Sequence, residues 1–123
     1  MDEENPLIEV SMQIILHAGD ARNNAHAACE AARVGDYDEA TKQMDEAREN
    51  IRLAHQAQTD TLQQEMAGQH YDLCILFIHA QDTLMTIKSE VLMAERIIAN
   101  GMNGRPPTIS AIRMMRISIR PPK

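Results

Sequence analysis

The chain has 123 residues with one Phe, two Tyr and no Trp, which suits a single domain with a core of Ala, Leu, Ile and Met. Such a core favours closely packed helices over a β-sheet, in which aromatic and β-branched residues are preferred. Residues 1–100 carry 18 acidic and seven basic side chains, so this region has no broad basic face and nucleic acid is excluded as its partner.

The first predicted helix spans about residues 6–34. Asn5-Pro6 is typical of a helix start, because Asn caps the free N–H groups and Pro is tolerated at the first helical position. Ile14 and a series of alanines then recur at spacings of three and four residues. This stripe of small side chains allows another helix to approach closely, and Gly35 supplies the stop.

The second predicted helix spans about residues 37–67. Asp36 precedes it as a candidate N-cap, and Glu39 follows at the spacing of a capping box. One face of this helix repeats Ala, Met and Ile, whereas the opposite face is charged. The pattern predicts an amphipathic helix that buries one stripe and exposes the rest.

The third predicted helix spans about residues 70–100. Turns at Gly35 and Gly68 separate three helices of similar length, so we predict an all-α fold, an antiparallel three-helix bundle, for residues 1–100. Residues 101–123 carry five basic and no acidic side chains. We expect them to form a flexible, basic C-terminal extension.

The cysteines and the hydropathy pattern predict the compartment. Cys29 and Cys74 have neither a metal-ligand nor a redox spacing, and a reducing cytoplasm is the default for such a chain. No secretory leader opens the chain, and no apolar run reaches the length of about 18 residues that a membrane span needs. We therefore expect a cytoplasmic protein without direct membrane insertion.

The start of the third predicted helix is apolar on all sides, with the sequence LCILFI at residues 73–78. A surface helix of a small monomer needs only one apolar stripe, and two other helices cannot cover every side of the third. We therefore expect an oligomer in which the third helix faces both its own bundle and a neighbouring subunit.

His79 and Asp82 interrupt this apolar stretch and share one helical face. Buried polar groups cost free energy unless they are paired or used. In a cyclic assembly, copies of Asp82 would approach one another, and converging carboxylates favour a hard cation such as Mg²⁺. A neutral imidazole is a nucleophile near pH 7, so His79 in a crevice between subunits would suit phosphoryl transfer.

Two other interpretations of the same residues remain open. A helical metal-binding module would use His79 and Asp82 as ligands, although one His and one Asp make a thin ligand set. A purely structural oligomerisation module would keep both as ordinary interface residues, the commoner role of a lone His in an apolar helix. His17, on the first predicted helix, is either a second polar group near the crevice or a helix-face residue.

Four segments together resemble one protein family. IHAQDTLMT at residues 78–86 resembles a segment of the enzyme IIA component of the lactose/cellobiose/chitobiose family of the bacterial phosphoenolpyruvate-dependent sugar phosphotransferase system. HAGDAR at 17–22, EAARVGDYDEA at 30–40 and EARENIRLAHQAQT at 46–59 resemble the same family in the same order and spacing. The resemblance covers about residues 12–99.

The resemblance implies a function and a set of partners. It implies a homotrimer assembled through the third helix, in which His79 accepts a phosphoryl group from the histidine-containing phosphocarrier protein. His79 would then pass this group to a cysteine of the cognate enzyme IIB during disaccharide uptake. It further implies that Asp82 holds a divalent metal, usually Mg²⁺, at the trimer axis, and that Gln81 lies near the site.

The sequence departs from the family pattern at two places. Thr83 stands where many members have a second His, so a polar neighbour of the site is changed. The basic extension at 101–123 follows a point at which the third helix of the family usually finishes.

Overall fold

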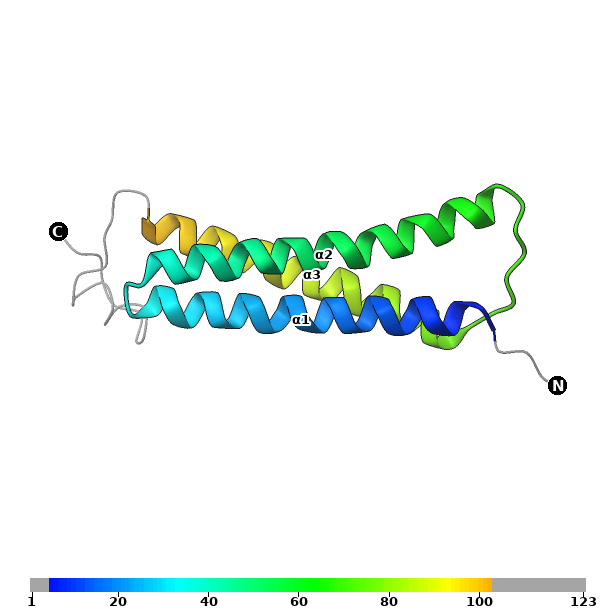
Figure 1. Ribbon diagram of the computed structural model, residues 1–123, viewed down its shortest axis with the longest axis horizontal. Helices are drawn as coiled ribbons and strands as arrows, with labels where there is room; N and C mark the ends of the chain where they lie inside the picture. Colours follow the sequence, from blue (N-terminus) through cyan, green and yellow to red (C-terminus); the bar gives the residue numbers. More distant parts are fainter. Residues whose placement is uncertain (1–4, 103–123) are drawn as a thin grey trace.

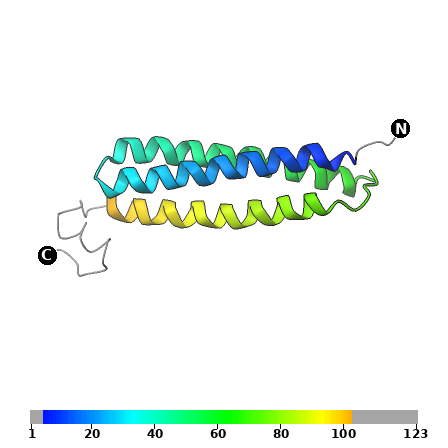
Figure 2. The same cartoon turned by 90° about the horizontal axis from the view of Figure 1, so that it is seen from below.

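The computed structural model describes residues 5–102, which form three helices and no strand (Figure 1). The helices are α1 (Leu7–Arg33), α2 (Tyr37–Met66) and α3 (Ile75–Met102). They run side by side along the long axis in alternating directions (Figures 1 and 2), which confirms the all-α three-helix prediction. The predicted flexible extension lies outside the described residues, apart from its first two positions.

The core side chains are small between α1 and α2 and larger toward α3. Six alanines of the first two helices have no exposed surface: Ala18, Ala21, Ala28, Ala40, Ala47 and Ala54. Because these side chains end at Cβ, the backbones of α1 and α2 can approach closely. The larger core side chains include Ile14 of α1 and Leu84 and Ile87 of α3.

The starts of α1 and α2 follow the sequence pattern, except that Pro6 is the cap residue of α1 and not its first helical residue. Helix α1 begins at Leu7 with Pro6 at the cap position, and the side-chain oxygen of Asn5 accepts the Leu7 N–H at 2.9 Å. Helix α2 has the predicted N-cap, because the carboxylate of Asp36 accepts the Glu39 N–H at 3.2 Å. The preceding Gly35 has φ +84°, a conformation that side chains disfavour.

The third helix begins at Ile75, and the prediction of a start near residue 70 is wrong. The side-chain amide of Asn5 donates hydrogen bonds to the carbonyl oxygens of Asp72 and Leu73, at 3.2 and 3.4 Å. These contacts with the N-terminal end of the chain hold the connection in a non-helical path. The carbonyl of Cys74 is the first acceptor of the helix.

The third helix also extends further than the sequence suggests, as far as Met102, the last residue that the structure describes. Gly101 therefore lies within the helix instead of beyond it. A Cβ atom at this position would lie 3.0 Å from the hydroxyl oxygen of Tyr37, so the missing side chain makes room for the start of α2. None of the three helices is long and apolar enough to cross a membrane, within residues 5–102.

A chain of polar side chains joins α1 to α2. The ring Nδ1 of His17 lies 3.1 Å from Oδ1 of Asn50, whose amide donates to Asn24 at 2.9 Å. Asn24 in turn donates to Gln43 at 3.1 Å. This network occupies His17 at the contact between two helices, where it helps to fix their register.

Two ion pairs tie α3 to the other helices. Arg22 of α1 donates two hydrogen bonds of 2.8 Å to Glu90, and Arg48 of α2 pairs with Glu95. The hydrogen bonds from Arg22 lower the pKa of the Glu90 carboxyl below its usual value. The pair therefore stabilises the fold above the ordinary carboxyl pKa, and this contribution is lost as the pH falls. Because both partners are exposed, the contribution is small.

The Asp36 cap gives a first prediction. Asp36→Ala should lower the free energy of unfolding by about 1 kcal/mol, because the free N–H of Glu39 loses its acceptor. Urea unfolding followed by circular dichroism measures this difference. Asp36→Asn should retain most of the stability, since Asn caps about as well as Asp. Equal loss in both variants would contradict the capping role.

Candidate functional site

An exposed stripe of apolar side chains runs along α3. It consists of the apolar side chains of Ile75, Ile78, Met85 and Leu92 together with the carboxylate of Asp82 among them, and we call it the outer stripe. Ile75 is 75% exposed, Ile78 53% and Met85 51%. Soluble monomers rarely expose apolar side chains in such a contiguous row, which marks this face as an interaction surface.

The sequence-predicted site residues lie together at the N-terminal end of this stripe. They line an open hollow of about 600 Å³, whose six lining residues all come from α3: Ile75, Ile78, His79, Gln81, Asp82 and Met85. Ala80 and Leu84, between and beyond them, are fully buried. Because the buried residues anchor the opposite face of the helix, the side chains of His79 and Asp82 are exposed to solvent.

Thr83 is a neighbour of His79 in the structure. Its hydroxyl oxygen lies 3.5 Å from Nε2 of His79, one helical turn away. At this length the contact is a weak hydrogen bond. The four-residue spacing of His79 and Thr83 in the sequence is the signal for this contact, because residues four apart lie on one face of a helix.

The hollow of one subunit holds one carboxylate and one imidazole. Asp82 forms no ion pair with any residue from 5 to 102, and no group of three His, Cys, Asp or Glu side chains in this range could hold a metal ion. Oxygen atoms of Asp82 are the ligand type that Mg²⁺ prefers. Residues 5–102 of one chain therefore offer Asp82 too few neighbouring ligands for a metal site.

The hollow around His79 is open and not enclosed. A site for a small substrate usually encloses most of its ligand, whereas this hollow is a depression on one helix. An exposed imidazole on such a surface is accessible to a group carried by another protein. The arrangement fits covalent transfer between proteins better than turnover of an enclosed substrate.

The comparisons with known proteins agree on one family. Residues 9–100 match the family model described as "PTS system, Lactose/Cellobiose specific IIA subunit". The chain is 40% identical over 98 residues to the lichenan-specific phosphotransferase enzyme IIA component of Bacillus subtilis, which covers 80% of this chain and 87% of that protein. It is 42% identical over 77 residues to the lactose-specific EIIA component of Lacticaseibacillus casei, covering 63% of this chain and 69% of the relative.

A solved structure supports the same relationship. The cellobiose-specific enzyme IIA from Bacillus anthracis superposes with a TM-score of 0.73 at 34% identity, covering 79% of this chain and 89% of that one. The match includes the helix that carries His79, Gln81 and Asp82, since the family model extends over residues 9–100. The chain therefore belongs to the lactose/cellobiose-specific IIA family of the sugar phosphotransferase system.

Proposed function

We propose that this protein is a phosphohistidine carrier that acts in the cytoplasm during uptake of a lactose-, cellobiose- or chitobiose-type sugar. His79 would accept a phosphoryl group from the histidine-containing phosphocarrier protein and pass it to a cysteine of the cognate enzyme IIB. The observation that carries this proposal is the exposed His79 in an open hollow, on a chain of the IIA family.

The transfer requires only one reacting group from this chain. An unprotonated ring nitrogen of His79 attacks the phosphorus atom held by the donor histidine, so that a new N–P bond forms while the donor N–P bond breaks. In the second step the thiolate of enzyme IIB attacks the same phosphorus atom, an S–P bond forms, and His79 is released. Exposure of the imidazole supports this sequence, because two different proteins must reach it.

Gln81 and Thr83 are the polar neighbours in this scheme. Gln81 lines the same hollow as His79 and carries amide N–H groups that can donate to phosphoryl oxygens. Thr83 lies beside Nε2 of the imidazole and can help to orient the ring. We assign both residues to positioning of His79 and its phosphoryl group, and not to the bond-making step.

The outer stripe supports a homotrimer as the working assembly. Its members recur at spacings of three, four, three and seven residues, the repeat with which parallel helices pack against one another. Removing these exposed side chains from water provides a driving force for association. In a threefold arrangement the copies of α3 would surround the axis, and His79 would lie at the edge of each contact.

Asp82 would then be the metal ligand of the assembly. Its place within the outer stripe would bring three carboxylates toward the axis, where they repel one another unless a cation neutralises them. Three carboxylates suit Mg²⁺ or another hard divalent cation. The role we assign to the metal is to neutralise these charges and stabilise the trimer.

The metal role predicts that Asp82→Asn has a lower thermal midpoint than the native protein in MgCl₂ and a higher one in EDTA. Addition of MgCl₂ should raise the thermal midpoint of the native protein and leave that of Asp82→Asn unchanged. In EDTA the order should reverse, because the amide removes the repulsion between carboxylates. Asp20→Asn, an exposed substitution on α1, serves as the control and should respond to Mg²⁺ like the native protein. An identical Mg²⁺ response in Asp82→Asn and the native protein would contradict the metal role.

Intact-mass spectrometry tests the carrier function. The protein is incubated with phosphoenolpyruvate, enzyme I and the phosphocarrier protein at basic pH, since phosphohistidine is labile in acid. A gain of one phosphoryl group per subunit is expected, followed by its loss when enzyme IIB is added. Light scattering should give three times the 13.8 kDa mass of one chain. No gain in mass beside a phosphorylated donor would refute the proposal.

A further inference from the structure

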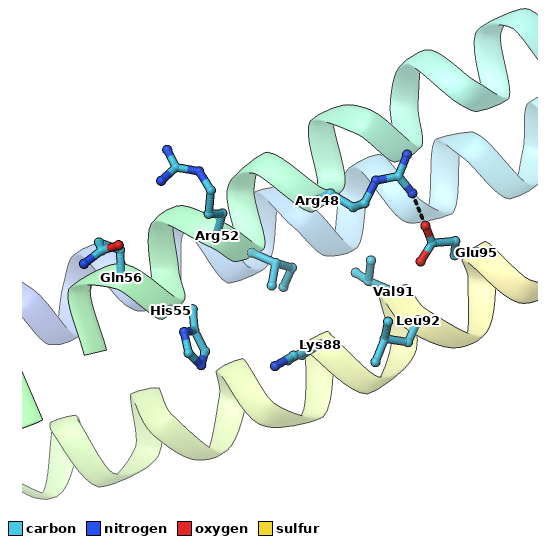
Figure 3. A pocket seen from close by; sticks show the side chains of 9 residues that line it. Arg48, Arg52, His55, Gln56, Lys88, Val91, Leu92 and Glu95 are labelled. Carbon is cyan, nitrogen blue, oxygen red and sulfur yellow. Dashed lines mark hydrogen bonds and ion pairs between the residues drawn. The ribbon is translucent and has the colours of Figure 1, made fainter. Parts of the chain in front are cut away.

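A second hollow lies between α2 and α3, away from the hollow around His79. It has a volume of about 360 Å³, and the two hollows share no lining residue. In Figure 3, His55 of α2 and Lys88 of α3 lie in the space between the two helices, whereas Arg52 and Gln56 point away from α3. Four of the lining residues carry basic groups, namely Arg48, Arg52 and His55 of α2 and Lys88 of α3. We call this hollow the basic pocket.

The basic pocket is rich in basic side chains, whereas the rest of the domain is mainly acidic. Residues 1–100 carry 18 acidic and seven basic side chains, yet three of these seven line this one pocket. Glu95 is its one acidic lining residue, and Arg48 already pairs with it. The pocket therefore gathers three of the seven basic side chains of a domain that is otherwise strongly acidic.

The ion pairs show which cation is left for a ligand. Arg48 also contacts Asp45, and Arg52 pairs with Glu49 at 2.7 Å on the outside of α2. Lys88 forms no ion pair with any residue in the described range 5–102. In Figure 3 its side chain extends between the helices toward His55. Lys88 is half-buried and has no ion-pair partner among these residues of the range 5–102. An anion that enters the pocket would therefore stabilise its ammonium group more than it would stabilise the two paired arginines.

The remaining lining residues add an apolar wall. Ile51 of α2 and Val91 and Leu92 of α3 lie among the basic residues. An anion with no apolar part would leave this wall in contact with water, whereas an organic group would cover it. Lys88 and His55 offer N–H donors from two different helices, which suits a tetrahedral anion with oxygen atoms pointing in several directions.

We propose that the basic pocket binds a small organic phosphate monoester. Its phosphoryl oxygens contact Lys88 and His55, and its organic group lies against Ile51 and Leu92. This binding is separate from phosphoryl transfer, because the basic pocket and the hollow of His79 share no lining residue. A phosphate monoester in the basic pocket would therefore be a second ligand of the protein, one that takes no part in phosphoryl transfer through His79. Leu92 belongs to both the pocket and the outer stripe, so such a ligand would also border the surface used for assembly.

Isothermal titration calorimetry with phenyl phosphate tests the proposal at constant ionic strength. The full chain carrying His79→Ala is used throughout, so that binding near the phosphoacceptor does not contribute. We expect saturable binding of phenyl phosphate, at least tenfold weaker binding in Lys88→Met, and recovery in Lys88→Arg. Lys42→Met, an exposed substitution on α2, is the matched control and should bind like its parent.

The other arms separate the possible outcomes. Inorganic phosphate should bind at least fivefold more weakly than phenyl phosphate, because it leaves the apolar wall uncovered. Light scattering on every variant ensures that lost binding is not caused by lost assembly. No binding of phenyl phosphate, equal binding in Lys88→Met, or equal binding of inorganic phosphate would each overturn the assignment of an organic phosphate to this pocket.

Discussion

His79→Ala should remove phosphoryl acceptance completely. The imidazole is the group of the open hollow that forms a stable phosphoryl derivative by attack at neutral pH, since the amide of Gln81 is a far weaker nucleophile and the Asp82 carboxylate would give a different, short-lived acyl phosphate. After incubation with the phosphocarrier relay, the variant should show the mass of the unmodified chain. Because His79 is exposed, the substitution should change the free energy of unfolding by no more than about 0.5 kcal/mol.

A matched histidine variant makes this result specific. His26 is an exposed histidine on α1, outside the hollow, and His26→Ala should accept one phosphoryl group like the native protein. Peptide mapping at basic pH would place the modification on the segment that contains residue 79. Full phosphorylation of His79→Ala would move the acceptor to another of the five histidines and refute the assigned site.

The local parts of the fold were predictable from the sequence. The three-and-four spacing of alanines on α1 needs no distant contact to be recognised, and neither does the Asp36 cap, whose donor lies three residues away. The grouping of His79, Gln81 and Asp82 was predictable for the same reason. They lie within about one turn of a single helix, so their proximity follows once the helix is assigned.

The features that the sequence did not predict depend on distant pairs. The late start of α3 reflects hydrogen bonds from Asn5 to Asp72 and Leu73, residues more than 60 positions apart. The basic pocket requires His55 and Lys88 to face the same space, which depends on how α2 and α3 are aligned. Periodicity gives the buried face of each helix but not the register between two helices. The homotrimer stays a prediction, because it concerns contacts between chains.

Two adjacent residues of α3 offer a way to separate folding from assembly. Leu84 has no exposed surface and packs in the core of its own subunit, whereas Met85 is 51% exposed on the outer stripe. Leu84→Ala removes buried methyl groups and leaves a cavity, so it should lower the free energy of unfolding by about 3 kcal/mol. Because this side chain is fully buried within its own helix bundle, the loss should be the same at every protein concentration.

Met85→Ala should give the opposite pattern. It removes little from the core of one subunit, but it takes apolar surface away from the proposed contact between copies of α3. We expect its dissociation to occur at higher protein concentration than in the native protein, and its stability at a given concentration to be lower. Urea unfolding at several protein concentrations, with light scattering on the same samples, measures both effects. If Met85→Ala left association unchanged, the outer stripe would not be the contact surface, whereas a small effect of Leu84→Ala would contradict the packing of the core.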